Sequence, residues 1–351
     1  MGTIMNTPDV KLAQAEIKLV AQIDEFKGKW QVLSSLAPDQ LQALKKVATI
    51  ESIGSSTRIE GAKLSNREIE ELLSGLHVTR LASRDEAEVA GYAECMELVF
   101  TSHADIRVDE NHIRQLHLVL LKHVPKDTRH RGEYKKLPNH VEAFDQDGKS
   151  AGIVFQTASP FDTPGMMADL VGWLQSELAE NNMHPLLAIA VFIVNFLAIH
   201  PFQDGNGRLS RILTTLLLLK AGYGYVTYSS LERIVETNKE QYYLALRRSQ
   251  QTIYTDNSTL MEWLRFFLRA LLSQVAALEK KIKDEEKLAE LPPLSVDLLR
   301  LARDRGRLTV RDGVAITGAN RNTVKLHVRN LCTRGLLHQE GQLKGSWYRP
   351  A

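Results

Sequence analysis

The sequence predicts a mainly α-helical protein with one small β-hairpin and a C-terminal domain of mixed helix and strand. Two apolar runs, residues 186–199 and 209–219, are too long for strands and indicate buried helices. A hairpin is predicted where an Asp-Gly turn separates two short β-rich segments. The chain changes character after Leu291-Pro-Pro293, which predicts a domain boundary there.

Composition and charge are those of an ordinary soluble globular protein with two or three domains. The chain has 351 residues, of which 44% are hydrophobic and 25% are charged. A formal net charge of +2 neither requires nor excludes nucleic acid as a partner. The two cysteines, Cys95 and Cys332, follow no metal or redox spacing and fit a reducing cytoplasm.

The sequence predicts neither a signal peptide nor a membrane helix. Residues 1–10 lack the apolar centre of a signal peptide. The apolar run 185–199 contains Asn195 and is too short to span a bilayer. We therefore expect a cytoplasmic protein without a membrane partner.

The N-terminal region is predicted to be helical. Residues 9–48 read as two helices, and Pro38 starts the second. In the next segment Ser56 and Glu60 are four residues apart and share one helix face, and Gly61 suits a helix C-cap. Taken alone, such a Ser–Glu pair is most simply explained as solvated surface.

Further helices are predicted before and after the hairpin. One of them starts after Asp109, and its apolar stripe faces the core. His112 and His117 on that helix are interpreted as packing or surface residues, because no second histidine lies four residues away. The predicted helices are residues 67–73, 84–100, 110–121 and 164–178, and the predicted hairpin strands are residues 141–144 and 153–155.

Residues 200–211, with the sequence His-Pro-Phe-Gln-Asp-Gly-Asn-Gly-Arg-Leu-Ser-Arg, concentrate polar groups between the two apolar helices. A helix that begins at Asn206 offers unpaired N–H groups to an anion such as phosphate. Arg208 and Arg211 lie three apart on one side of that helix and can hold phosphate oxygens. Asp204 is placed to hold Mg²⁺, and His200 can accept a proton near neutral pH.

An ordinary turn followed by solvated arginines is the alternative explanation of this segment. Five distinct chemical elements within twelve residues make that explanation the weaker one. A Walker-type phosphate loop is excluded, because no Gly-Lys-Ser/Thr follows the turn.

The segment resembles the signature of the Fic (AMP-transferase) family, His-X-Phe-X-Asp/Glu-Gly-Asn-Gly-Arg-X-X-Arg, and matches every fixed position. The resemblance implies transfer of AMP from ATP to a hydroxyl of a target protein. It makes His200 the general base and Asp204 the Mg²⁺ ligand. The residues that it assigns to the ATP phosphates are Gly205, Asn206, Gly207, Arg208 and Arg211.

The same resemblance extends to the segment before the core. Ser56-X-X-X-Glu60-Gly61 is similar to the family's inhibitory-helix motif, here at about residues 52–61. In that interpretation Glu60 pairs with Arg211 and occupies the place that the γ-phosphate needs.

Two more segments are similar to parts of the family. The hairpin region, about residues 139–157, corresponds to a flap that would pair with an extended target segment presenting Ser, Thr or Tyr. The chain departs from many relatives in having Thr157-Ala-Ser-Pro160 where they have consecutive prolines. Asn238, with Tyr242 or Tyr243, would line the adenine pocket, although aromatic residues that simply fill the core explain that segment equally well.

Residues 295–351 resemble the winged helix-turn-helix group. Helices are predicted at 296–305, 310–317 and 321–334, and strands at 336–337 and 343–348. Duplex DNA is the expected partner, although winged helices also bind proteins. The side chains expected on the recognition helix are Arg321, Asn322, Lys325 and Arg329.

Together these features predict an autoinhibited Fic-type protein adenylyltransferase, with a mainly α core, a hairpin flap and a winged helix. The expected domains are residues 1–107, 108–290 and 291–351. Two alternatives stay open: a DNA-binding regulator whose core senses nucleotide, and an enzyme that removes AMP with a water oriented by Glu60. The target, the modified side chain, the transferred group and the oligomeric state, a homodimer included, also stay open.

Overall fold

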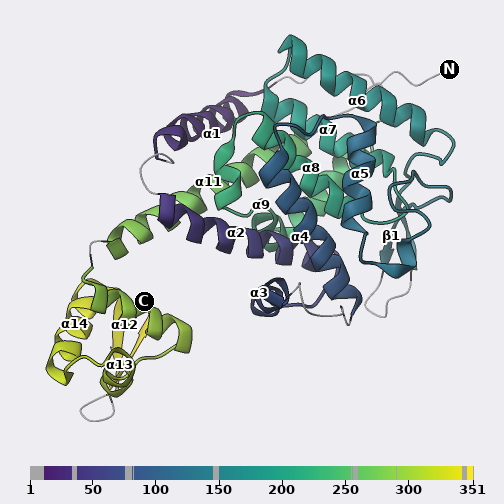
Figure 1. The fold of residues 1–351 in the computed structure, drawn as a ribbon. Coiled ribbons are helices and arrows are strands. Elements are labelled where there is room, and N and C mark those ends of the chain that lie inside the picture. Colours follow the sequence, from purple (N-terminus) through teal and green to yellow (C-terminus); the bar gives the residue numbers. More distant parts are fainter. Residues whose placement is uncertain are drawn as a thin grey trace. The chain divides into compact units, whose positions relative to one another are not determined.

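The computed structural model describes residues 12–33, 38–75, 81, 83–144, 150–253, 255, 260–289, 291–341 and 346–350. The chain divides into two units, Met1–Leu278 and Glu279–Ala351 (Figure 1). Each unit has its own core and is described by itself. In the described residues, no helix combines the length and the hydropathy needed to cross a membrane.

Two buried helices form the centre of the first unit. In α7 (Pro185–Ile199) every residue after the first is buried. In α8 (Asn206–Lys220) only Gly207 and Lys220 are not. The prediction of two buried helices is therefore confirmed. Helix α7 has no polar face and is stable only when it is enclosed. Helix α8 can be enclosed because its polar side chains have partners, such as Glu60 for Arg211 and the carbonyl oxygen of Ser210 for Thr214.

The other helices of the first unit surround this pair (Figure 1). Helix α6 packs on α7, both α4 and α5 pack on α8, and α2 packs on α4 and α9. Their bounds are α1 (Gln14–Leu33), α2 (Pro38–Ile59), α3 (Asn66–Gly75), α4 (Arg84–Ser102), α5 (Glu110–Leu120), α6 (Thr163–Glu180), α9 (Leu231–Thr237), α10 (Lys239–Gln250) and α11 (Met261–Ala289). The part of α11 from Glu279 on belongs to the second unit.

Local capping explains several helix starts. Asp109 caps α5 as predicted, since its carboxylate accepts a hydrogen bond from the backbone N–H of His112. Ser83 and Ser230 cap α4 and α9 in the same way. Helix α6 starts at Thr163, and its N-cap residue Asp162 makes no capping bond from its side chain.

The segment that carries Ser56 and Glu60 is not a separate helix. Helix α2 runs without interruption over 22 residues from Pro38 to Ile59, so the predicted inhibitory helix is the C-terminal end of a longer one. Gly54 lies within this helix, at a place where α3 packs closely against it. A Cβ at this position would come within 2.9 Å of the Ile69 side chain of α3, so the close packing requires glycine. The helix ends at Ile59, and Glu60 and Gly61 form the turn that follows it. Gly61 has a φ of 105°, which suits glycine.

The predicted hairpin is present as two antiparallel strands, β1 (Val141–Phe144) and β2 (Ser150–Phe155). The predicted Asp-Gly turn, at residues 146–148, lies outside the described residues. Strand β2 packs on α10.

The second unit has three helices and two strands in the described residues. Its elements are α12 (Pro293–Arg305), α13 (Val310–Thr317), α14 (Arg321–Thr333), β3 (Leu337–Glu340) and β4 (Trp347–Pro350). The strands are antiparallel, and Leu298, Val324 and Leu331 belong to the unit's buried core. The element order is the predicted one, but the second strand starts later than predicted, and residues 342–345 lie outside the described residues. The winged-helix interpretation stays a prediction.

Candidate active site

The residues of the predicted signature line one cavity in the first unit, with a volume of about 790 Å³. The end of α2, the loop after α7, the first turns of α8, and α10 all contribute to it. This volume is typical of small-molecule sites. The predicted residues that line it are Glu60, His200, Asp204, Gly205, Asn206, Gly207, Arg208, Arg211, Tyr242 and Tyr243.

The N-terminus of α8 opens into this cavity. Gly205 is the N-cap residue with φ 80°, and no side chain caps the helix. The Asn206 side chain is buried and turned back on the loop, where it accepts from Phe202 N at 2.9 Å and donates to Phe202 O at 2.6 Å. Asn206 therefore shapes the loop with its side chain, and its backbone N–H belongs to the turn that an anion meets.

His200 ends α7 in the left-handed conformation, with φ 54° and ψ 59°. Its Nδ1 lies 3.3 Å from the carbonyl oxygen of Leu197, which can only accept a hydrogen bond. Nδ1 is therefore the protonated nitrogen, and Nε2 keeps its lone pair. Burial lowers the pKa of His200 to about 4, so the ring is neutral at pH 7 and able to accept a proton.

Arg211 is buried and bonded to the end of α2. Its Nη2 donates to Glu60 Oε1 at 2.7 Å and to Ser56 O at 3.0 Å, and its Nε donates to Ser56 Oγ at 2.8 Å. Burial disfavours the charged guanidinium, but the Glu60 carboxylate outweighs this effect and raises the pKa of Arg211. The two predicted partners are thus in direct contact, although 151 positions separate them in the sequence.

Glu60 also lies directly against the first turn of α8. A Cβ built on Gly207 would collide with Glu60 Oε1. Only glycine at this position lets the carboxylate come so close to the helix N-terminus. The Glu60 carboxylate therefore occupies the position where the N-terminus of α8 favours an anion.

Two long-range contacts fix the end of α2 in this place. Arg58 Nε donates to Glu236 Oε1 at 2.7 Å, next to the end of α9. Lys239 Nζ donates to the carbonyl oxygen of Ile59 at 2.7 Å and so satisfies one of the last carbonyls of α2. The position of Glu60 thus depends on the α9–α10 segment.

Arg208 and Asp204 belong to a network of four charged residues. The other two, Arg84 and Glu88, were not predicted from the sequence. Arg208 lies 3.1 Å from Glu88 and 3.4 Å from Asp204. Arg84 lies 3.0 Å from the other oxygen of Asp204 and 2.8 Å from Glu88. The four-residue spacing of Arg84 and Glu88 on one helix was the available signal, but surface pairs show the same spacing.

His117 is buried and bonds to the loop between α7 and α8. Its Nδ1 accepts from Gly132 N at 2.8 Å, so its Nε2 carries the proton and donates to Asp204 O at 2.9 Å. The ring stacks on Phe202 with centroids 3.8 Å apart. His117 is a packing residue, as predicted, and it also fixes the backbone at Asp204.

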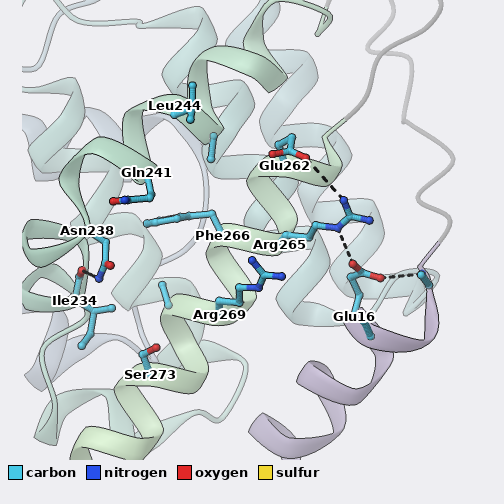
Figure 2. A pocket seen from close by; sticks show the side chains of 14 residues that line it. Glu16, Ile234, Asn238, Gln241, Leu244, Glu262, Arg265, Phe266, Arg269 and Ser273 are labelled. Atoms are coloured by element: carbon cyan, nitrogen blue, oxygen red, sulfur yellow. Dashed lines mark hydrogen bonds and ion pairs between the residues drawn. The ribbon is translucent and has the colours of Figure 1, made fainter.

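The three residues predicted to line the adenine pocket do not all line the same cavity. Tyr243 is 40% exposed at the cavity, whereas Tyr242 is buried against Trp263 and Phe266. Asn238 does not line this cavity: it lines another, of about 650 Å³, between α1, α9, α10 and α11 (Figure 2). Its Nδ2 donates to the carbonyl oxygen of Ile234 in α9, so the side chain folds back on that helix.

The predicted recognition-helix residues all lie on α14 in the second unit. Arg321, Asn322, Lys325 and Arg329 are exposed, whereas Val324 and Val328 on the same helix are buried. One face of α14 therefore packs in the core, and the other presents cationic side chains to solvent.

Residues 107–218 match the model of the Fic/DOC family. The chain is 29% identical over 255 residues to a protein adenylyltransferase Fic from Drosophila mojavensis, a match that covers 70% of this chain and 47% of that protein. The chain thus spans about half the length of the curated relatives it matches.

Two solved structures are similar to the whole chain or most of it. A Fic family protein from Desulfovibrio desulfuricans has a TM-score of 0.62 and 23% identity, and the match covers 98% of both chains. A Fic domain containing signaling protein from Bacteroides thetaiotaomicron has a TM-score of 0.59 and 25% identity, over 74% of this chain and 97% of that one. Residues 107–218 therefore carry a Fic/DOC family domain, and the chain shares the fold of solved Fic proteins.

Proposed function

We propose that this protein is an adenylyltransferase, which transfers AMP from ATP to a hydroxyl side chain of a target protein. The observation that carries the proposal is one cavity that contains a neutral His200, a helix N-terminus without a side-chain cap and two buried arginines. The relatives named protein adenylyltransferase Fic support the same activity.

The reaction needs positioning and charge neutralisation more than covalent catalysis. The triphosphate would bind at the N-terminus of α8, with Arg208 and Arg211 on its oxygens. His200 Nε2 would take the proton of the attacking hydroxyl as that oxygen bonds to the α-phosphorus and pyrophosphate leaves. The neutral ring and its fixed tautomer support this role.

Asp204 is the residue that would hold Mg²⁺. Its side chain is 38% exposed at the cavity, and the described residues contain no group of three metal-binding side chains. This fits Mg²⁺, which is commonly bound through one or two carboxylates together with substrate phosphates. When bound, the ion would neutralise phosphate charge, and Arg84 would have to release the oxygen of Asp204 that it now contacts.

We propose that Glu60 inhibits the enzyme. Its carboxylate holds Arg211 and lies where the γ-phosphate would bind, so ATP would bind with its α-phosphorus poorly aligned. We further propose that an extended target segment pairs with the β1–β2 hairpin, and that the second unit binds duplex DNA through α14.

Removal of AMP from a modified protein is a second candidate activity. Glu60 is one-third exposed and uses Oε1 for Arg211, which leaves Oε2 able to orient a water molecule. In that case Glu60→Gln should abolish the release of AMP from a modified protein, while it increases the transfer of AMP.

The test is incubation of the full chain and Glu60→Gly with Mg²⁺ and ATP labelled in either the α- or the γ-phosphate. We expect covalent label from the α-labelled ATP alone, stronger in Glu60→Gly and absent in the Glu60→Gly/His200→Ala double variant. Label from the γ-phosphate would indicate phosphoryl transfer instead. Absence of label from both would leave a nucleotide-sensing regulator as the better explanation.

A further inference from the structure

A buried lysine lies between the hairpin and the loop that carries His200. Lys135 is only 3% exposed. Its Nζ donates three hydrogen bonds: to Asn139 Oδ1 at 2.8 Å, to Thr157 Oγ1 at 3.0 Å and to Ile199 O at 2.9 Å. An ammonium group has three protons, so each of them has an acceptor.

The three acceptors belong to two different parts of the site. Asn139 lies two residues before β1, and Thr157 lies two residues after β2, so both flank the base of the hairpin. The carbonyl of Ile199 immediately precedes His200. A single amine thus connects both ends of the hairpin with the backbone of the proposed general base.

Neighbouring contacts extend this connection past His200. Asn139 Nδ2 donates to His200 O at 3.2 Å and to Phe202 O at 2.6 Å. The backbone N–H of Lys135 donates to Pro201 O at 2.8 Å. Four consecutive carbonyls, from Ile199 to Phe202, therefore accept hydrogen bonds from Lys135 or Asn139.

His200 needs such support because of its backbone conformation. A residue other than glycine at φ 54° is strained and keeps this conformation only where its surroundings impose it. The backbone conformation sets the direction of the Cα–Cβ bond, and the contact of Nδ1 with the carbonyl oxygen of Leu197 holds the ring. Contacts that fix the carbonyls on both sides of His200 therefore fix the position of Nε2.

The chemistry of Lys135 argues against simple core filling. No carboxylate contacts its amine within the described residues, and burial lowers the pKa of Lys135 to about 8. A methionine would fill the same space without the cost of burying a charge. The amine is best explained by its three donated bonds.

We propose that Lys135 is a positioning residue that couples the hairpin to His200. When a target segment binds the hairpin, the bonds through Asn139 and Thr157 hold the loop so that Nε2 of His200 meets the attacking hydroxyl. The catalytic consequence rests on the proposed adenylyltransfer, whereas the mechanical coupling does not.

The test compares three variants of the full chain. Lys135→Met keeps an unbranched side chain that is one atom shorter, and it removes all three N–H donors. Asn139→Asp keeps an acceptor for Lys135 but removes the donors to His200 O and Phe202 O. Lys136→Met is the matched control, because Lys136 is exposed at the next position.

The first measurement is hydrogen–deuterium exchange, which needs no activity. In Lys135→Met we expect exchange to increase about tenfold both in the hairpin strands and in residues 199–206, with no change in Lys136→Met. An increase in only one of the two segments, or in neither, overturns the coupling. If Lys135→Met fails to fold, Asn139→Asp decides: coupling predicts faster exchange in residues 199–206.

The second measurement is AMP transfer in the Glu60→Gly background. We expect kcat to fall roughly 30- to 100-fold in Lys135→Met and Asn139→Asp, with the KM for ATP changed less than about threefold. Unchanged kcat, or a rise confined to KM, overturns the positioning role. If the parent transfers no AMP, the proposed function fails, and the exchange result alone decides the coupling.

Discussion

Cationic side chains occupy opposite environments in the two units. On α8, Arg208 and Arg211 are at most 7% exposed and contact carboxylates. On α14, Arg321, Lys325 and Arg329 are exposed, and no ion pair joins them to other described residues. The α8 pair lies in the first two turns of its helix, and the α14 set extends from the first residue to the ninth. Both sets were predicted to contact phosphates.

This difference in burial shows which charged residues are better evidence of a function. A buried charge is costly unless it is paired, so a chain that keeps two buried arginines at one helix start has a use for them. An exposed cation costs almost nothing and is compatible with DNA, protein or solvent as its partner. The case for the α8 site is therefore structural, while the case for α14 needs a binding measurement.

The largest expected effect concerns the base beside the α8 arginines. His200→Ala in the Glu60→Gly background should lower AMP transfer by ~10²–10⁴, because the proposed general base is then missing. Transfer of label from ATP to the protein itself is the measurement, with His112→Ala on α5 as the control. Labelling at the parent rate would remove His200 from the mechanism.

The second effect tests whether pairing controls Arg211. Glu60→Gly should raise transfer by ~10², mostly in kcat, because the carboxylate leaves the start of α8 and frees the guanidinium. Glu60→Gln should activate as well if the charge is what matters. In a double-mutant cycle the activation should be lost in the Arg211→Ala background, and equal activation there would show that the two residues act independently.

The third effect separates buried from exposed charge by stability. Glu88→Ala leaves Arg208 with Asp204 alone, and it should lower the free energy of unfolding of the first unit by about 3 kcal/mol. Arg329→Ala on α14 should change the stability of the second unit by less than about 0.5 kcal/mol. Chemical denaturation, followed by hydrogen exchange in each unit, measures both. Similar losses at the two sites would break the comparison.

The fourth effect is a pH dependence that arises in the first unit. Burial lowers the pKa values of His117 and His200 to about 4, below the value of about 6.5 in an unfolded chain. Between these pH values the unfolded state binds more protons, so stability should fall as the pH is lowered from about 6.5 to 4. The loss should be smaller in His117→Gln, and kcat/KM should fall on the acidic side near pH 4. A stability that is flat over this range would contradict the lowered pKa values of the two histidines.

The smallest expected effect on transfer comes from α14. Replacing Arg321, Lys325 and Arg329 by alanine should leave AMP transfer unchanged. It should reduce the log–log salt slope of duplex binding by about 0.9 for each phosphate contact removed, roughly 2.7 in all. Gel shifts of the full chain over a salt series measure this slope. No shift at low salt with the parent chain would favour a protein partner for the second unit.

The sequence by itself determined the features that depend only on residues close together along the chain. The run 186–199 has no polar face, so burial on all sides was the stable outcome for that helix. The run 209–219 is mostly apolar, and its length alone predicted a buried helix. The cap at Asp109 and the two hairpin strands were also visible locally. The segment from His200 to Arg211 could be predicted as a site because all its polar groups lie within twelve residues.

Only the tertiary structure decided the contacts between distant segments. Helix packing brings Glu60 against Gly207 and Arg211, and it places Arg84 on Asp204. It also places the amine of Lys135 between the hairpin and His200. The local pattern of a buried lysine or a helical Arg–Glu pair is the same as that of a surface residue, because the sequence does not state what packs against it. For the same reason Asn238 was predicted to line one cavity and lines another. The sequence motif gives only its neighbours along the chain. The packing of α9, α10 and α11 decides which cavity its side chain lines.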